Sequence, residues 1–243
     1  MDDWVVILRG DARDLEDLSK IFTTPDLIIK KVVENDYQFY FLTSAQFTLS
    51  SSYQFVKDES LKIAEKLTAI IKLQWDSRKP IEIDCIRQYH NEGKISVFLE
   101  GKISASSRGR ASLQIVKKDG SVEISDPADP LRTLMKIARK DAKVAKAFHY
   151  FSAFSNPWSN YCKVLEIMEE DQFKPIMRNG IHTKKANKLT ATANCELAIG
   201  SEARHAKESI PRPKDPMSLS EARSFIKMLL HEWLKEKESK NNV

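Results

Sequence analysis

The order of apolar and polar residues divides the chain into a first part built from short strands and a second part built from helices. Short apolar runs rich in β-branched and aromatic residues predict strands, whereas apolar residues at steps of three and four predict amphipathic helices. The strand pattern ends near Pro127, and the patterns after it have helical spacing. We therefore predict an α+β protein, with an N-terminal domain over residues 1–126 and an all-helical domain over residues 127–243.

The first part alternates strands with two helices. One helix is expected behind the capping residues Asp11 and Asp14, and a longer one from Asp58 to Trp75, with Pro80 beyond its end. Polar turns between neighbouring strands predict antiparallel hairpins. This order resembles a split β-α-β fold, in which an antiparallel sheet carries two helices, and that fold hosts many activities. The predicted strands cover residues 4–8, 27–33, 37–43, 81–85, 95–99, 113–116 and 122–124.

The apolar pattern of the second part predicts a long helix followed by further helices. Asp129-Pro130 supplies an N-cap and a first-turn proline, and an apolar stripe at helical spacing then runs from Leu131 to Phe148. The final helix opens with the capping box Ser218-Leu219-Ser220-Glu221. Its tail from Lys235 to Val243 is polar and mixed in charge, so we expect that tail to fray.

Positive charge is concentrated in the second part. The net charge of the chain is +5, but residues 1–127 carry 18 basic and 20 acidic side chains, whereas residues 128–243 carry 21 and 14. The outer face of the predicted helix over residues 131–148 holds basic residues and only one acid, Asp141. This pattern predicts a basic ridge of about five turns. Such a ridge suits a polyanion, and the alternative is an ordinary solvated face. The candidate nucleic-acid-binding residues are Arg132, Lys136, Arg139, Lys140, Lys143 and Lys146.

Composition narrows the class of protein. No apolar stretch is long enough to cross a membrane, and the acidic start Met1-Asp2-Asp3-Trp4 is unlike a signal peptide, so we expect a cytoplasmic protein. The three cysteines are isolated, which favours small buried apolar residues over a disulfide framework. No histidine has a cysteine or acid at metal-ligand spacing, so we expect no metal and no cofactor. The cysteines are Cys85, Cys162 and Cys195.

Two arginine and histidine pairs in the helical part are candidates for chemistry. The first is Arg204-His205, with Asn194 upstream, and the second is Arg178 with His182. Arginine is a permanent charge that grips a phosphodiester, and histidine exchanges a proton near neutral pH. Together they suit metal-independent RNA cleavage. The alternative is a structural role, in which the Arg204 side chain caps a helix and pairs with a nearby acid such as Glu202.

Residues 129–238 resemble the helical domains of the HEPN superfamily, which includes prokaryotic ribonucleases of toxin and phage-defence systems. The family motif has four to six residues between an arginine and a histidine, whereas Arg178 and His182 are separated by three residues and Arg204 and His205 by none. The resemblance implies a homodimer in which both arginine and histidine pairs face one composite groove. It also implies that the catalytic residues are Arg204, His205 and Asn194, or alternatively Arg178 and His182.

Two hypotheses follow from these patterns. In the first, the chain interacts with nucleic acid, as a cleaving or a binding protein: Arg204 positions the scissile phosphate, His205 transfers a proton, and the basic ridge holds the flanking backbone. In the second, the chain is a non-catalytic module that binds another protein, and the basic ridge docks an acidic partner. The salt dependence of RNA affinity discriminates between them, because phosphate contacts weaken steeply as salt rises.

Overall fold

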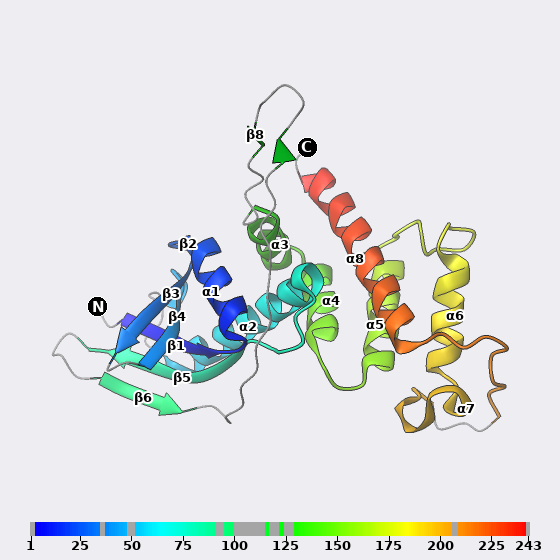
Figure 1. Cartoon of the computed structure of the whole chain (residues 1–243), viewed down its shortest axis with the longest axis horizontal. Helices are drawn as coiled ribbons and strands as arrows, with labels where there is room; N and C mark the ends of the chain where they lie inside the picture. The colour runs from blue at the N-terminus through cyan, green and yellow to red at the C-terminus, as the bar shows by residue number, and fades with distance from the viewer. Residues whose placement is uncertain are drawn as a thin grey trace. The chain divides into compact units, whose positions relative to one another are not determined.

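The protein is described by a computed structural model that covers residues 3–34, 37–47, 52–90, 95–99, 115–116, 122–123, 129–205 and 209–241. The chain divides into two compact units, Met1–Met135 and Lys136–Val243. The first unit is coloured mainly blue to cyan in Figure 1 and contains an antiparallel sheet, and the second, mainly light green to red, is helical. The predicted α+β class is confirmed. The boundary expected between residues 126 and 127 lies outside the described residues.

The sheet of the first unit has six strands in the order β2-β3-β4-β1-β5-β6, and all neighbours pair antiparallel. Because β1 lies between β4 and β5, the connections β1-α1-β3 and β4-α2-β5 each pass over one strand. This is the split β-α-β arrangement that the order of the predicted elements resembles. The strands are β1 (Asp3–Arg9), β2 (Thr23–Thr24), β3 (Leu27–Glu34), β4 (Tyr37–Thr43), β5 (Glu82–Tyr89) and β6 (Ile95–Leu99). A separate pair is formed by β7 (Ile115–Val116) and β8 (Val122–Glu123), and the rest of the predicted last hairpin lies outside the described residues.

One face of the sheet packs against the helices α1 (Ala12–Ile21) and α2 (Tyr53–Trp75). Lys31 on β3 and Tyr40 on β4 are register partners, and both bond to the Glu16 carboxylate of α1 at 2.9 Å. These two hydrogen bonds lower the pKa of Glu16 to about 2. At the other edge, the ring of Phe98 on β6 stacks on Tyr53 of α2 with centroids 4.2 Å apart. Fully buried strand residues between them, namely Val6, Leu42 and Ile86, form the core of this layer.

The ends of the two helices follow from local signals. Asp11 caps α1, since its carboxylate accepts the backbone N–H of Arg13 at 3.0 Å. The helix α2 ends at Trp75 as predicted, because Asp76 adopts a left-handed conformation with φ 56°. It begins at Tyr53, five residues before the predicted start, and Val56 within the added turn is fully buried. The apolar side of α2 therefore begins about one turn before Asp58, the predicted start of the helix.

The second unit is a bundle of helices around α5 (Pro157–Glu170), which contacts α4, α6 and α8. Its core contains Phe148, Val164, Leu189 and Leu229, none of which is exposed. The helix α3 (Asp129–Lys140) begins in the first unit and ends in the second. The other helices are α4 (Ala142–Ser152), α6 (Thr183–Ala193), α7 (Glu196–Ile199), the 3₁₀ turn η2 (Gly200–Glu202) and α8 (Leu219–Asn241).

The single long helix predicted over residues 131–148 is wrong, because the structure divides it at Asp141. This residue is extended, with φ −107° and ψ 111°, and its carboxylate accepts the backbone N–H groups of Lys143 at 2.9 Å and Val144 at 3.1 Å. That is an N-cap in the middle of the expected helix, and it separates α3 from α4. The predicted ridge of five continuous turns is therefore two shorter groups of basic residues.

The last helix, α8, confirms one prediction and corrects another. The capping box is present: Ser218 N–H donates to the Glu221 carboxylate at 2.8 Å, and Glu221 N–H donates to Ser218 Oγ at 3.2 Å. The expected fraying after Lys235 is wrong, because α8 continues to Asn241. The side chain of Lys237 makes two ion pairs with carboxylates of the second unit, and these pairs hold the final turns in place.

Candidate nucleic-acid interface and the Arg204 pocket

Basic side chains gather in residues 136–146, which we call the cationic segment. Lys136, Arg139 and Lys140 lie at steps of three and four on the last turns of α3, so they share one side of that helix, and all three are exposed. Lys146 on α4 is exposed as well. Within the part of the chain that the structure describes, Lys136, Lys140 and Lys146 have no ion-pair partner.

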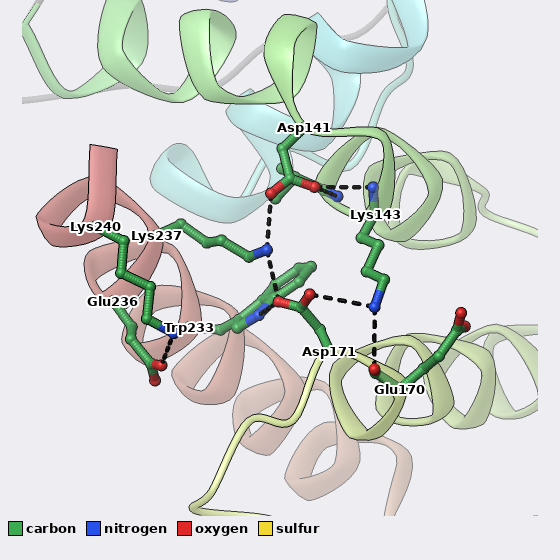
Figure 2. A network of polar contacts seen from close by, with 9 residues as sticks. Asp141, Lys143, Glu170, Asp171, Trp233, Glu236, Lys237 and Lys240 are labelled. Atoms are coloured by element: carbon green, nitrogen blue, oxygen red, sulfur yellow. Dashed lines mark hydrogen bonds and ion pairs between the residues drawn. The ribbon is translucent and has the colours of Figure 1, made fainter. Parts of the chain in front are cut away.

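The one acid of the cationic segment, Asp141, is neutralised from another helix. Lys237 on α8 places its ammonium group 2.7 Å from the Asp141 carboxylate and 2.6 Å from that of Asp171 (Figure 2). Trp233 donates its indole N–H to Asp171 at 2.9 Å. Lys143 lies 3.3 Å from the other oxygen of Asp171 and donates to the Glu170 carbonyl at 3.0 Å. We call Asp141, Lys143, Asp171, Trp233 and Lys237 the lysine network.

Charges in the lysine network balance at neutral pH. Burial by itself would raise the pKa of Asp141, but hydrogen bonds from Lys237 and the backbone of Val144 outweigh it and lower that pKa. The pKa of Asp171 is lowered in the same way, against burial, by Lys237 and Trp233. Burial opposes the charge of Lys237, yet its two carboxylate partners raise its pKa. Two carboxylates thus face two ammonium groups, and among the described residues Lys136, Lys140 and Lys146 keep no acidic partner.

Arg132, the first residue of the predicted basic ridge, has a different position. It belongs to the first unit, is half-buried, and donates its Nε–H to the backbone carbonyl of Ile21 at 2.8 Å. This bond joins α3 to the end of α1 within the first unit. Of the six predicted binding residues, Arg132 and Lys143 are half-buried and donate to backbone carbonyls, and Lys136, Arg139, Lys140 and Lys146 are exposed.

A pocket of about 460 Å³ lies between α5 and α6, next to the predicted catalytic residues. Its wall on α5 includes Cys162, Glu166 and Glu169, and its wall on α6 ends at Asn194. Burial raises the pKa of Glu169, and the neighbouring Glu166 carboxylate raises it further. Carboxylates on one wall make this pocket unfavourable for a phosphate group and suitable for a neutral or cationic group.

Arg204 lies beside this pocket and is held by α5. Its guanidinium donates to the Glu166 carboxylate at 2.8 Å, and its backbone N–H donates to the Ala193 carbonyl at 2.9 Å. The structural alternative named Glu202 as the acid that pairs with Arg204, but the ion pair observed is with Glu166, which is 38 positions away in the sequence. The helical packing of α5 against the end of α6 creates this contact, so sequence proximity could not reveal it.

The other two residues of the first predicted catalytic set have unequal surroundings. Asn194 lines the pocket, and its Oδ1 atom is buried without a hydrogen-bond partner among the described residues. His205 follows Arg204 and is exposed. The structure therefore brings Arg204 and Asn194 to the same end of α6, because Ala193 accepts the Arg204 backbone bond, and it leaves the His205 ring in solvent.

Cys162, at the wall of the pocket, is not prepared as a nucleophile. Burial raises the pKa of its thiol, and the nearby Arg204 only partly opposes that effect. A thiol with a raised pKa stays protonated at neutral pH and reacts slowly. Cys85, Cys162 and Cys195 are all free and buried, as the sequence predicted.

The second predicted pair, Arg178 and His182, lies in the turn before α6 and not on a helix. Arg178 is exposed, whereas His182 contacts α8: its Nε2 atom is 3.1 Å from the Glu232 carboxylate, and its ring meets Phe225 edge-on. Gly180 between them packs against the backbone of residues 174–175, where a Cβ atom would lie 2.4 Å from the Pro175 carbonyl oxygen. The contacts of His182 with Glu232 and Phe225 thus hold the turn against α8, and they do not involve Arg178.

Neither a metal-binding cluster nor a membrane-spanning helix is present among the described residues. No group of three or more His, Cys, Asp or Glu side chains in the described ranges is arranged to hold a metal ion. No helix in the described ranges is both long enough and apolar enough to cross a membrane.

Comparisons with family models, with curated proteins and with solved structures found no match to this chain. The HEPN resemblance therefore stays a prediction, and the functional argument depends on the cationic segment and on the surroundings of Arg204.

Proposed function

We propose that this protein binds RNA through the cationic segment of its second unit. The observation that carries the proposal is the exposure of Lys136, Lys140 and Lys146 without an acidic partner among the described residues. Asp141, the acid that would otherwise weaken their field, is held by Lys237. Lys136 and Lys140 lie one helical turn apart, about 6 Å along the axis, so one phosphodiester chain can contact both. Lysine clusters of this kind supply the salt-dependent part of nucleic-acid affinity.

An acidic protein partner would also be attracted to this segment, but it would need an apolar centre to bind specifically. Stable protein interfaces bury aromatic or aliphatic anchors inside a polar rim. The exposed side of α3 is made of Lys136, Arg139 and Lys140, while its apolar residues Ile137 and Ala138 are buried in the unit. A surface of charges without an apolar anchor favours the phosphate backbone as its partner.

RNA cleavage is a second candidate, favoured by the position of His205. His205 is exposed and follows Arg204 in the sequence, and Arg204 bonds to Glu166 of the pocket that Asn194 also lines. A histidine beside an arginine suits acid-base cleavage of a phosphodiester without metal. However, the Arg204 guanidinium is bound by Glu166, so a phosphate must displace that carboxylate before cleavage. For this reason binding is proposed as the function, and cleavage is treated as the outcome of a separate test.

The test of binding is a fluorescence-anisotropy titration of the full chain against a labelled single-stranded RNA at low salt. The variant Lys136→Glu/Lys140→Glu/Lys146→Glu should bind at least about tenfold more weakly, since several phosphate contacts are lost. The control Lys174→Glu/Lys184→Glu/Lys185→Glu changes the net charge equally at three other exposed lysines. Equal losses in both variants would show that net charge alone attracts RNA, and this would contradict the proposal.

Cleavage is tested on the same RNA in EDTA, with gel analysis of the products. Products that disappear in His205→Ala, while the RNA affinity of that variant stays the same, would establish the ribonuclease. Intact RNA with undiminished binding would leave the protein as a binding module. Products that persist in His205→Ala would place the chemistry at another residue or in a contaminant.

A further inference from the structure

The pocket between α5 and α6 has an unequal balance of charge. Its α5 wall carries two carboxylates, those of Glu166 and Glu169, which are three positions apart and therefore share one side of the helix. The guanidinium of Arg204 bonds to Glu166 at 2.8 Å. Glu169 has no hydrogen-bond or ion-pair partner among the described residues. One of the two negative charges is thus left without a cation.

The lysines of α5 and α6 do not supply that cation. Lys163 on α5 lies over the Tyr150 ring, 4.7 Å from its centroid, and Lys188 on α6 pairs with Asp215. The two lysines in the first turn of α6 are exposed and form no ion pair with the part of the chain that the structure describes. They are Lys184 and Lys185. The charge of Glu169 is therefore not compensated from either wall of the pocket.

The lysine network shows how the same unit balances such charges. It places two ammonium groups against two carboxylates, and the pKa of each carboxylate is lowered. In the pocket, burial and the neighbouring Glu166 carboxylate raise the pKa of Glu169 instead. A second cation beside Glu166 and Glu169 would give the pocket the balance that the lysine network already has.

The α6 wall provides an acceptor that also lacks a donor. Asn194 lines the pocket, and its Oδ1 atom is buried without a hydrogen-bond partner among the described residues. An unpaired buried acceptor is costly, so the site favours a ligand that brings its own donors. Leu165 and Ala191 add apolar atoms to the lining, and the volume of about 460 Å³ is in the range of small-molecule sites. The pocket therefore suits a cation that has several N–H donors and a short apolar body.

We propose that this pocket binds a primary ammonium group carried on a short alkyl chain. An ammonium group is a compact cation with three N–H donors, so it compensates the charge of Glu169 and supplies donors to the acceptors of the lining. The alkyl chain lies against Leu165 and Ala191. The same chemistry occurs in a free aliphatic amine and in a lysine side chain of another polypeptide. No pocket residue belongs to the cationic segment, so this site goes beyond the proposed RNA binding and does not depend on it.

The experiment is a titration of the full chain with n-butylamine near neutral pH, followed by the backbone amide signals of α5 and α6 in proton–nitrogen NMR spectra. The wild type should show saturable shifts of these signals. Glu169→Gln removes the charge and keeps the size of the side chain, so the dissociation constant should rise at least about tenfold. The matched control is Glu170→Gln, at the next residue of α5, which is exposed and outside the pocket lining. Its dissociation constant should stay within about twofold of the wild-type value, and butyrate, an anion of the same chain length, should cause no saturable shifts.

A second titration distinguishes the two sources of the ammonium group. Nα-acetyl-lysine N-methylamide carries the same group on a peptide backbone. If it binds at least as tightly as n-butylamine, the site takes a lysine of a partner polypeptide. If it binds several-fold more weakly, the pocket excludes the backbone and the ligand is a free amine. Either result supports the proposal only when Glu169→Gln weakens it.

Three results would overturn the inference: no saturable shifts with n-butylamine, equally tight binding of butyrate, or equal losses in Glu169→Gln and Glu170→Gln. The last result would show that the negative charge of α5 by itself attracts amines. If Glu169→Gln does not fold, Ala191→Leu decides, because it fills the pocket from an exposed position of α6. Binding of n-butylamine should then be lost, and unchanged binding would contradict the site.

Discussion

One buried lysine and three exposed lysines of the second unit have the same chemistry but different surroundings. Lys237 is largely buried, with 15% of its side chain exposed, and it contacts two carboxylates and the Trp233 ring. Lys136, Lys140 and Lys146 are exposed and unpaired among the described residues. A buried ammonium group must be compensated where it lies, whereas an exposed one remains available to a partner. The comparison therefore assigns a role in stability to Lys237 and a role in binding to the three exposed lysines.

The largest expected effect comes from removing the centre of the lysine network. Lys237→Ala leaves the carboxylates of Asp141 and Asp171 half-buried without their shared cation, so we expect a loss of about 2 kcal/mol in the free energy of unfolding. Urea denaturation measures this loss. The control Lys235→Ala, at an exposed position on the same helix, should cost less than about 0.5 kcal/mol. Equal stability of the two variants would contradict the role assigned to the network.

The network should also make unfolding sensitive to acid. The pKa values of Asp141 and Asp171 are lowered in the folded state, so the stabilisation is complete above the unfolded value of about 3.9. It is lost as the pH falls below about 4 toward the folded values, because the unfolded chain takes up protons first. Denaturation between pH 5 and pH 2.5 should therefore show a shallower decline for Asp141→Asn/Asp171→Asn than for the wild type. Parallel curves would assign the acid sensitivity to other carboxylates.

Replacing the exposed lysines should affect stability much less than replacing Lys237. Lys136→Glu/Lys140→Glu/Lys146→Glu is expected to change the free energy of unfolding by less than about 1 kcal/mol, since no described partner is lost. Thermal denaturation of the variant beside Lys237→Ala tests this contrast. A large destabilisation would mean that these side chains take part in folding, and its loss of RNA binding could then not be assigned to direct contacts.

The smallest effect on stability is expected at the Arg204 pocket. The Glu166 side chain is 55% exposed, so its ion pair with Arg204 contributes at most about 1 kcal/mol. Glu166→Gln should therefore leave the melting temperature nearly unchanged, yet it removes the carboxylate that competes with phosphate for Arg204. RNA affinity should rise by a few fold in anisotropy titrations. No rise, or a fall, would show that Arg204 is a structural residue that RNA does not reach.

The strands and most helices were predictable because local signals in the sequence encode them. Tyr37–Thr43 was predicted with the bounds of β4, and the capping box of α8 was evident from Ser218 and Glu221. The break at Asp141 was missed because the apolar stripe continues across it. Aspartate is one of the preferred N-cap residues, so Asp141 could have been recognised as a possible cap inside the long helical pattern.

The surroundings of the candidate site were less predictable, because they depend on contacts between distant segments. Nothing in the sequence connects Glu166 with Arg204, or Lys237 with Asp141, which are 96 positions apart. The sequence predicts fraying after Lys235 for the same reason, because it does not reveal that Lys237 pairs with Asp141 and Asp171 in other segments. Residue types identified which side chains could bind phosphate, and only the fold separated the paired cations from the exposed ones.

The most direct test of the account is the salt dependence of RNA affinity in the wild type and in Lys136→Glu/Lys140→Glu/Lys146→Glu. Plotted as the logarithm of the binding constant against the logarithm of salt concentration, each phosphate contact with a single strand contributes about 0.7 to the slope. If the three lysines contact phosphates, the slope of the variant should be less steep by about 2. Equal slopes for the two proteins would show that these lysines do not contact RNA, and would contradict the proposed function.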